Sequence, residues 1–97
     1  MMKEYFITWS PLAEETYLKT LSLILERWTH KEAEDFEAKV NSLIEKLKIH
    51  NQLCPPSGKQ KFIRRCVITP QTSLIYQIKA NTIELVAFFD NRSNHKG

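Results

Sequence analysis

The chain has 97 residues, of which 42% are hydrophobic and 26% are charged. This balance predicts one globular domain over residues 1–97 and excludes a disordered chain. No apolar run approaches the roughly 20 residues that span a bilayer, and the N-terminus lacks the apolar core of a signal peptide. We therefore expect a cytoplasmic protein that makes no contact with a membrane.

The first predicted element is a strand over Glu4–Trp9, with Tyr5, Ile7 and Trp9 on one face. Ser10-Pro11 predicts the start of a helix, because serine is a favourable N-cap and proline suits the first helical position. Helical spacing then connects the apolar residues Leu12, Ala13, Tyr17, Leu21, Ile24, Leu25 and Trp28.

A second helix is predicted after Thr29, because Thr29-x-x-Glu32 is a capping box. With almost no linker between them, the two helices should form an antiparallel hairpin. We expect the hairpin to pack on a sheet through the apolar residues of both helices, namely Leu21, Ile24, Trp28, Phe36, Val40, Leu43 and Leu47. Trp9 is expected to pack in the core as well.

The segment Asn51–Gly58 ends the second helix, since Pro55 and Pro56 cannot continue it. Three strand-like runs follow at short intervals, over Phe62–Ile68, Ser73–Ile78 and Thr82–Phe89. Such closely spaced strands can pair only as an antiparallel meander. The predicted fold class is therefore α+β, in the order β-α-α-β-β-β, with an antiparallel sheet and a helical hairpin on one face.

The cysteines and histidines predict neither a metal site nor any cofactor. Cys54 and Cys66 lack a Cys-x-x-Cys spacing, and His30, His50 and His95 lie far apart in the sequence. In a reducing compartment we expect no disulfide, and both cysteines should act as small apolar residues. His30 and His50 are expected at the surface, near helix ends.

Strand alternation separates neighbouring side chains in the second half of the chain. Arg64 and Arg65 should point to opposite faces, so both cannot line one open surface. Phe88 and Phe89 should likewise diverge, whereas Tyr76 should pack on the helix side with Leu74 and Ile78.

The net charge of +3 is divided unevenly along the chain. Residues 1–50 contain seven basic and nine acidic residues, a net charge of −2. Residues 51–97 contain seven basic and two acidic residues, a net charge of +5. This asymmetry indicates that the sheet half faces a polyanion or an acidic partner.

Four segments, in this order, resemble the RelE/ParE superfamily of toxins from type II toxin–antitoxin modules. They are Ile7-Thr8-Trp9-Ser10-Pro11-Leu12-Ala13, the turn Pro56-Ser57-Gly58-Lys59, the strands Ile63–Ile68 and Leu74–Ile78, and the last strand with its basic exit, Ile83–Arg92. The resemblance spans nearly the whole chain. It implies a growth-arresting toxin that a cognate antitoxin neutralises in a hetero-oligomeric complex.

The family has two biochemical branches, and the resemblance leans toward one of them. ParE-like members poison DNA gyrase, and RelE-like members cleave messenger RNA on the ribosome. RelE-like nucleases typically carry an arginine where this chain has Ser73, which favours the ParE branch. The expected target-binding residues are Lys59, Lys61, Arg64, Arg65 and Arg92.

Two alternatives stay open beside the ParE-like interpretation. In a ribosome-dependent endoribonuclease, Arg65, Arg92 and His95 would be the catalytic residues, with His95 transferring protons. In a degenerate member, the chain would bind an antitoxin without any activity of its own. Whether the chain is an enzyme is thus open at this point.

Overall fold

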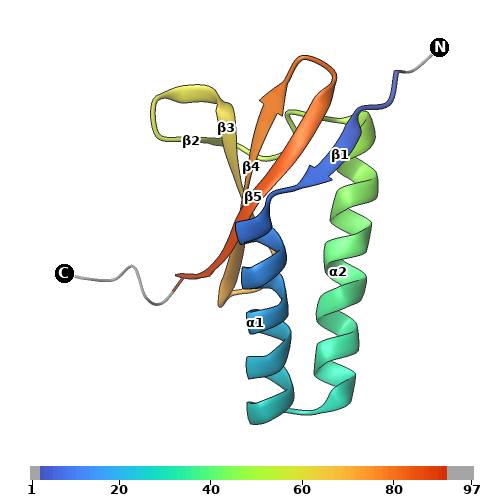
Figure 1. Ribbon diagram of the computed structural model, residues 1–97, viewed down its shortest axis with the longest axis vertical. Helices are drawn as coiled ribbons and strands as arrows, with labels where there is room; N and C mark the ends of the chain where they lie inside the picture. Colours follow the sequence, from blue (N-terminus) through green and yellow to red (C-terminus); the bar gives the residue numbers. More distant parts are fainter. Residues whose placement is uncertain (1–2, 92–97) are drawn as a thin grey trace.

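The computed structural model of the protein describes residues 3–91. Two helices cover one face of a five-stranded sheet (Figure 1). In chain order the elements are β1 (Phe6–Trp9), α1 (Pro11–Arg27), α2 (His30–Ile49), β2 (Pro56–Ser57), β3 (Gln60–Val67), β4 (Thr72–Lys79) and β5 (Thr82–Asp90). The predicted α+β class is confirmed.

Both helices begin at the predicted caps. The Ser10 Oγ accepts a hydrogen bond from the backbone N–H of Ala13 at 2.9 Å, and Pro11 is the first residue of α1. The Thr29 Oγ1 accepts from the N–H of Glu32 at 3.2 Å, which starts α2. These caps satisfy backbone donors that the first helical turns leave free. The two helices lie side by side as an antiparallel hairpin (Figure 1).

The sheet order is β1-β5-β4-β3-β2, and one pairing differs from the all-antiparallel sheet expected from the sequence. Strands β3, β4 and β5 form the predicted antiparallel meander. Strand β1, however, pairs parallel to β5, with Phe6 opposite Thr82 and Trp9 opposite Leu85. The direction is set by the exit of β1 into α1, because Ser10 donates its N–H to the Leu85 carbonyl and its hydroxyl to the Val86 carbonyl.

The core lies between the hairpin and the sheet, and it contains most of the predicted residues. Phe36, Val40 and Leu47 of α2 are buried, as are Leu74, Tyr76 and Phe88 of the sheet. Leu21, Ile24 and Leu43 pack against this core. The rings of Trp9, Tyr17 and Phe88 form a cluster with centroids 5.3–5.8 Å apart.

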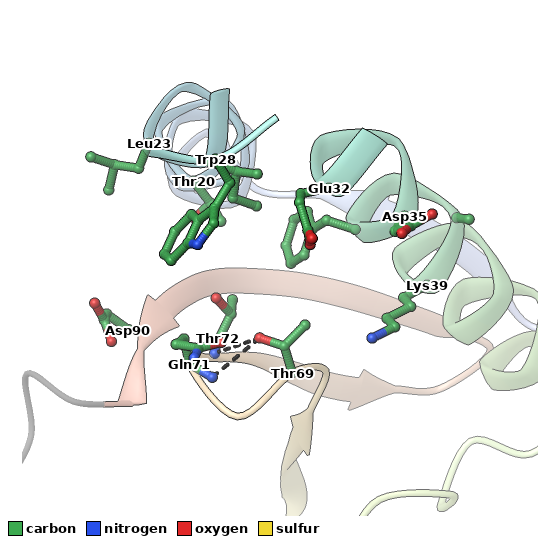
Figure 2. Close-up of a pocket in the computed structure, with 13 residues that line it drawn as sticks. Thr20, Leu23, Trp28, Glu32, Asp35, Lys39, Thr69, Gln71, Thr72 and Asp90 are labelled. Carbon is green, nitrogen blue, oxygen red and sulfur yellow. Dashed lines mark hydrogen bonds between the residues drawn. The ribbon is translucent and has the colours of Figure 1, made fainter. Parts of the chain in front are cut away.

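Trp28 is the predicted core residue that was wrong. Its side chain is 51% exposed. Trp28 is the C-cap of α1, with φ −130° and ψ −136°, so it has already left the helical geometry on which the stripe depends. The indole instead lines a groove beside the end of the hairpin (Figure 2).

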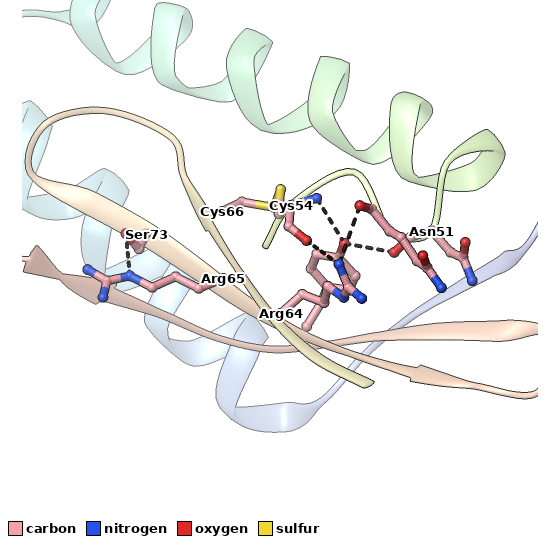
Figure 3. The surroundings of a disulfide bond; sticks show 8 residues. Asn51, Cys54, Arg64, Arg65, Cys66 and Ser73 are labelled. Carbon is pink, nitrogen blue, oxygen red and sulfur yellow. Dashed lines mark hydrogen bonds between the residues drawn. A yellow bond between two sulfur atoms is a disulfide. The ribbon is translucent and has the colours of Figure 1, made fainter. Parts of the chain in front are cut away.

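The cysteine prediction was also wrong, because Cys54 and Cys66 form a disulfide (Figure 3). The short strand β2, which was not predicted from the sequence, pairs antiparallel with β3. The Pro55 carbonyl also accepts a hydrogen bond from the Arg65 N–H. This pairing holds the loop against β3, so the two cysteine Cα atoms lie 5.3 Å apart, within the range that a disulfide needs.

Candidate functional site

The face of the sheet opposite the helices, which we call the open face, carries the candidate site. Alternation along β3 places Lys61, Ile63 and Arg65 on this face. The pairing of β3, β4 and β5 brings Arg65, Ser73 and Phe89 to neighbouring strands. Arg65 therefore lies near Ser73 of the adjacent strand β4 and near Phe89 of β5, the next strand beyond it.

The guanidinium of Arg65 is held by a small polar network. Its Nε donates to the Ser73 Oγ at 3.3 Å, and its Nη2 donates to the Asn91 Oδ1 at 3.0 Å. The same group lies 5.1 Å from the centroid of the Phe89 ring, which is within cation–π range. We call these four residues, Arg65, Ser73, Phe89 and Asn91, the Arg65 cluster.

Asn91 ties the Arg65 cluster to the turn between β3 and β4. Its backbone N–H donates to the Gln71 carbonyl at 2.7 Å, and its Nδ2 donates to the Pro70 carbonyl at 3.2 Å. The Ser73 hydroxyl donates to the Asn91 Oδ1 at 2.6 Å. The guanidinium is thus pre-oriented, and a guanidinium has five N–H donors, so two bonds leave donors available for an anion.

Arg64 lies on the other side of β3 and has a structural role. It is only 8% exposed. Its Nε donates to the Lys61 carbonyl at 2.9 Å and its Nη1 donates to the Cys54 carbonyl at 2.9 Å. Figure 3 shows Arg64 directed toward the Cys54 loop and Arg65 toward Ser73. The predicted divergence of the two arginines is confirmed, and Arg64 is not presented for binding a target.

The other expected site residues lie at the margin of the open face or beyond it. Lys59 is exposed in the turn between β2 and β3, and Lys61 is exposed near the start of β3, at the edge of the open face. Gly58 has a φ of +75° in this turn, a conformation that glycine adopts without strain. Arg92 and His95 lie outside the described residues.

Tyr76 packs on the helix side as predicted and is fully buried. Its hydroxyl donates to the Asn51 carbonyl at 2.8 Å and accepts from the Cys54 N–H at 3.4 Å. Burial raises the pKa of Tyr76, and the Cys54 hydrogen bond and the charge of Arg64 partly offset that rise. Tyr76 therefore supports the Cys54 loop and does not reach the open face.

Sequence reasoning missed the part that Ser73 and Asn91 play. Ser73 was interpreted only as the place of an absent arginine, although its hydroxyl contacts Arg65. No sequence pattern pointed to Asn91. Its side chain contacts Arg65 only because β3, β4 and β5 pair with one another in the folded sheet.

Neither a metal site nor a membrane-spanning helix is found within residues 3–91. No group of three or more His, Cys, Asp or Glu side chains in this range is placed to hold a metal ion. None of the helices in this range is long and apolar enough to cross a bilayer.

Comparison with known proteins identifies the fold. No family model matches the chain, and no curated protein matches it by sequence. Among solved structures, a chain of the chromosomal ParDE toxin–antitoxin system of P. aeruginosa is similar, with a TM-score of 0.72 and 11% identity over 90% of this chain and 96% of that one.

Two other toxin structures are similar over nearly their full length. One chain of the E. coli DinJ–YafQ toxin–antitoxin complex has a TM-score of 0.59 at 18% identity, covering 96% of this chain and 99% of that one. YoeB from Staphylococcus aureus, solved as a dimer, has a TM-score of 0.62 at 18% identity, covering 89% and 95%. Together these likenesses show that the described part of the chain has a RelE/ParE-like toxin fold.

Proposed function

We propose that this chain is the toxin of a type II toxin–antitoxin module and that it arrests growth by binding DNA gyrase. The observation that carries the proposal is the fold likeness to the ParDE structure over 90% of the chain, together with an open, cationic sheet face. The YafQ and YoeB structures are similar too, and they support the wider toxin assignment.

The Arg65 cluster supports a binding function for the open face. Arg65 is oriented by Ser73 and Asn91 before any partner arrives, which lowers the entropic cost of contacting a carboxylate or phosphate. Lys59 and Lys61 add exposed positive charge near the same strand. We assign target binding to Lys59, Lys61, Arg65 and Arg92, and we leave out Arg64 because it is buried.

Ser73 supports the gyrase branch over the nuclease branch. RNA cleavage through a 2′-hydroxyl needs a base, an acid and several cations around one phosphate. Ser73 stands where nucleases that resemble this chain carry an arginine, and here its hydroxyl accepts a hydrogen bond from Arg65. The set of groups needed for RNA cleavage therefore lacks one cation, whereas the cations that are present suit the binding of an anion.

The partner of the toxin is a cognate antitoxin. ParDE is a toxin–antitoxin system, and YafQ was solved in a complex with DinJ. An acidic stretch of the antitoxin would cover the basic open face, so association should slow as salt rises. Co-expression with the neighbouring reading frame, followed by pull-down, tests this; no co-purification and no relief of arrest would count against it.

The mechanism is tested by inducing the parent chain and three variants while following growth, gyrase supercoiling and transcript integrity in parallel. A gyrase-binding toxin predicts that Arg65→Ala and Arg92→Ala weaken arrest and that His95→Ala barely changes it. A nuclease predicts ribosome-dependent transcript cleavage that falls by roughly 10²-fold in His95→Ala. The second pattern would replace our proposal with the RelE-like alternative, and no arrest by the parent would leave only an antitoxin-binding protein.

A further inference from the structure

The guanidinium of Arg65 uses one of its edges inside the protein. Its Nε donates to the Ser73 Oγ at 3.3 Å (Figure 3), and its Nη2 donates to the Asn91 Oδ1 at 3.0 Å. Nε and Nη2 form the side edge of this planar group, and the two Nη atoms together form its end. The internal contacts therefore occupy the side edge and leave N–H donors at the end for a second partner.

The two acceptors on the side edge imitate a carboxylate but carry no charge. The Ser73 hydroxyl donates to the Asn91 Oδ1 at 2.6 Å, so two oxygen atoms lie side by side against the guanidinium. Arginine commonly presents such an edge to the two oxygens of a carboxylate. A real carboxylate would compensate the positive charge, whereas a hydroxyl and an amide do not. Arg65 is thus oriented as in an ion pair, and its charge stays available to a partner.

Asn91 sets this orientation because both ends of its amide are engaged. Its Nδ2 donates to the Pro70 carbonyl at 3.2 Å and to the Thr69 carbonyl at 3.5 Å. A carbonyl oxygen only accepts hydrogen bonds, so these contacts turn the Asn91 Oδ1 toward Arg65. The Phe89 ring, with its centroid 5.1 Å from the Arg65 Cζ, lies against one face of the guanidinium. Together these contacts restrict both the rotation and the tilt of the group.

Apolar side chains lie beside Arg65 on the open face. Ile75 is opposite Arg65 on β4, and Ile63 is two residues before it on the same face of β3. Both isoleucines are partly exposed, as is Phe89. An arginine among accessible apolar side chains is typical of the centre of a protein–protein interface, where arginine is enriched.

The lysines near the open face do not form a row with Arg65. Lys61 lies four residues away along β3, roughly 13 Å at the usual rise of a strand. Lys79 pairs with Glu84 at 3.1 Å, so this pair adds no net charge to the face. A nucleic-acid backbone is held by several lysines and arginines that each contact a phosphate. Among the described residues, the spacing of cations therefore favours one carboxylate of a protein over a nucleic acid.

We infer that Asn91 is a positioning residue: together with Ser73 it holds the guanidinium of Arg65 so that the end of the group binds one aspartate or glutamate side chain of the target protein. Apolar residues beside that carboxylate would contact Ile63 and Ile75. The inference rests on the proposed function only for the identity of the target. It makes the target contact a matched pair of charge and geometry, because both Nη atoms face the same carboxylate.

Three probes test the class of ligand on the full chain. Two are capped peptides that carry either a glutamate or a glutamine between leucines, and the third is a dinucleotide with a single phosphodiester, which matches the charge of the glutamate peptide. The readout is the Nε–H signal of Arg65 in an NMR titration, with the buried Arg64 as the internal reference. We expect the glutamate peptide to shift the Arg65 signal alone, the glutamine peptide to shift neither signal, and the dinucleotide to bind more weakly than the glutamate peptide.

The variant Asn91→Asp tests whether the acceptor has to be neutral. It converts the imitation into a real carboxylate that compensates the charge of Arg65, so binding of the glutamate peptide should weaken roughly tenfold. The control Asn41→Asp changes the net charge equally at an exposed position of α2, on the other side of the sheet, and should bind like the parent.

The variant Asn91→Ala tests orientation without a change of charge. The NMR order parameter of the Arg65 Nε–H should fall, because the guanidinium loses its Nη2 acceptor, while that of Arg64 should stay the same. Peptide binding should weaken by less than in Asn91→Asp. An unchanged Arg65 order parameter would show that Asn91 does not position the guanidinium and would overturn the inference.

The remaining outcomes are equally decisive. Equal binding of the two peptides, tighter binding of the dinucleotide, or undiminished binding by Asn91→Asp would overturn the inference, and the first two need only the parent chain. In cells, Asn91→Asp should relieve growth arrest and Asn41→Asp should not. If the parent causes no arrest, the proposed function fails, while the peptide and order-parameter results still decide the role of Asn91.

Discussion

Arg64 and Arg65 are neighbours in β3, and the two faces of the sheet give them opposite roles. Arg64 is buried and donates to backbone carbonyls that hold the Cys54 loop in place. Arg65 lies on the open face, where side chains orient its guanidinium and leave donors free. The contrast teaches that charge in the sequence does not identify a binding residue until the face and the local acceptors are known.

The largest expected effect is on the helix-covered face. Val40 of α2 is fully buried in the core, so Val40→Asp would bury a charge without a partner. We expect a loss of about 4 kcal/mol in the free energy of unfolding, measured by chemical denaturation. The exposed neighbour gives the control, because Asn41→Asp should leave stability nearly unchanged. Equal stability of Val40→Asp and the parent would show that the hairpin does not pack as described.

Loss of the disulfide should have the second largest effect on stability. Cys54 and Cys66 are separated by 12 residues in sequence, and closing a loop of that size restricts the unfolded chain. Replacing both cysteines by alanine should therefore lower the free energy of unfolding by about 3 kcal/mol under oxidising conditions. Under reducing conditions the parent and the variant should nearly coincide. A parent whose stability does not respond to a reductant would contradict this role of the bond.

The two arginines should differ in what their loss changes. Arg64→Ala leaves the buried Cys54 carbonyl without its donor, which should cost about 2 kcal/mol of unfolding free energy. Arg65→Ala removes a partly exposed side chain, so its cost should stay below about 1 kcal/mol. Thermal or urea denaturation of both variants measures the difference. If Arg65→Ala lost more unfolding free energy than Arg64→Ala, that result would contradict a structural role for Arg64 and a binding role for Arg65.

The smallest expected effect is the pH dependence caused by Tyr76. Burial raises its pKa above the ordinary value of 10.0, so the folded state holds the proton more tightly than the unfolded state. This contribution to the free energy of unfolding is fully present below the ordinary pKa of 10.0, and it is lost as the pH rises through the raised pKa of the folded state. Tyr76→Phe should make stability fall less steeply in this alkaline range.

Tyr17 also contributes to the fall of stability with rising pH, and a double variant separates its contribution from that of Tyr76. Burial also raises the pKa of Tyr17, with a further contribution from Glu37, so its titration contributes to the same slope with the same sign. The double variant Tyr17→Phe/Tyr76→Phe should therefore show a shallower slope than Tyr76→Phe. An unchanged slope in the double variant would assign alkaline unfolding to other groups.

Local patterns predicted the elements and the divergence of side chains well. The caps at Ser10 and Thr29 and the alternation that separates Arg64 from Arg65 depend on residues close in sequence, so the chain itself specifies them. Contacts between residues far apart in the sequence could not be predicted from these local patterns. The parallel direction of β1 depends on a contact with β5, and the Asn91 position in the Arg65 cluster depends on three strands.

The wrong predictions for Trp28 and for the two cysteines have related causes. The helical stripe was extended to Trp28, where the chain already turns toward α2, so periodicity no longer applied. The cysteines were judged from compartment and spacing, whereas the path of the Cys54 loop along β3 decides whether the two sulfur atoms meet. Both cases depend on how a connecting segment runs, which sequence periodicity does not encode.

The central claim is that the open face carries the function, and one comparison tests it most directly. Growth after induction should be measured for the parent and for Arg65→Ala, with the amount of folded protein matched between them. We predict that Arg65→Ala relieves the arrest while its thermal stability stays close to that of the parent. Full arrest by folded Arg65→Ala would contradict the claim and place the activity elsewhere on the molecule.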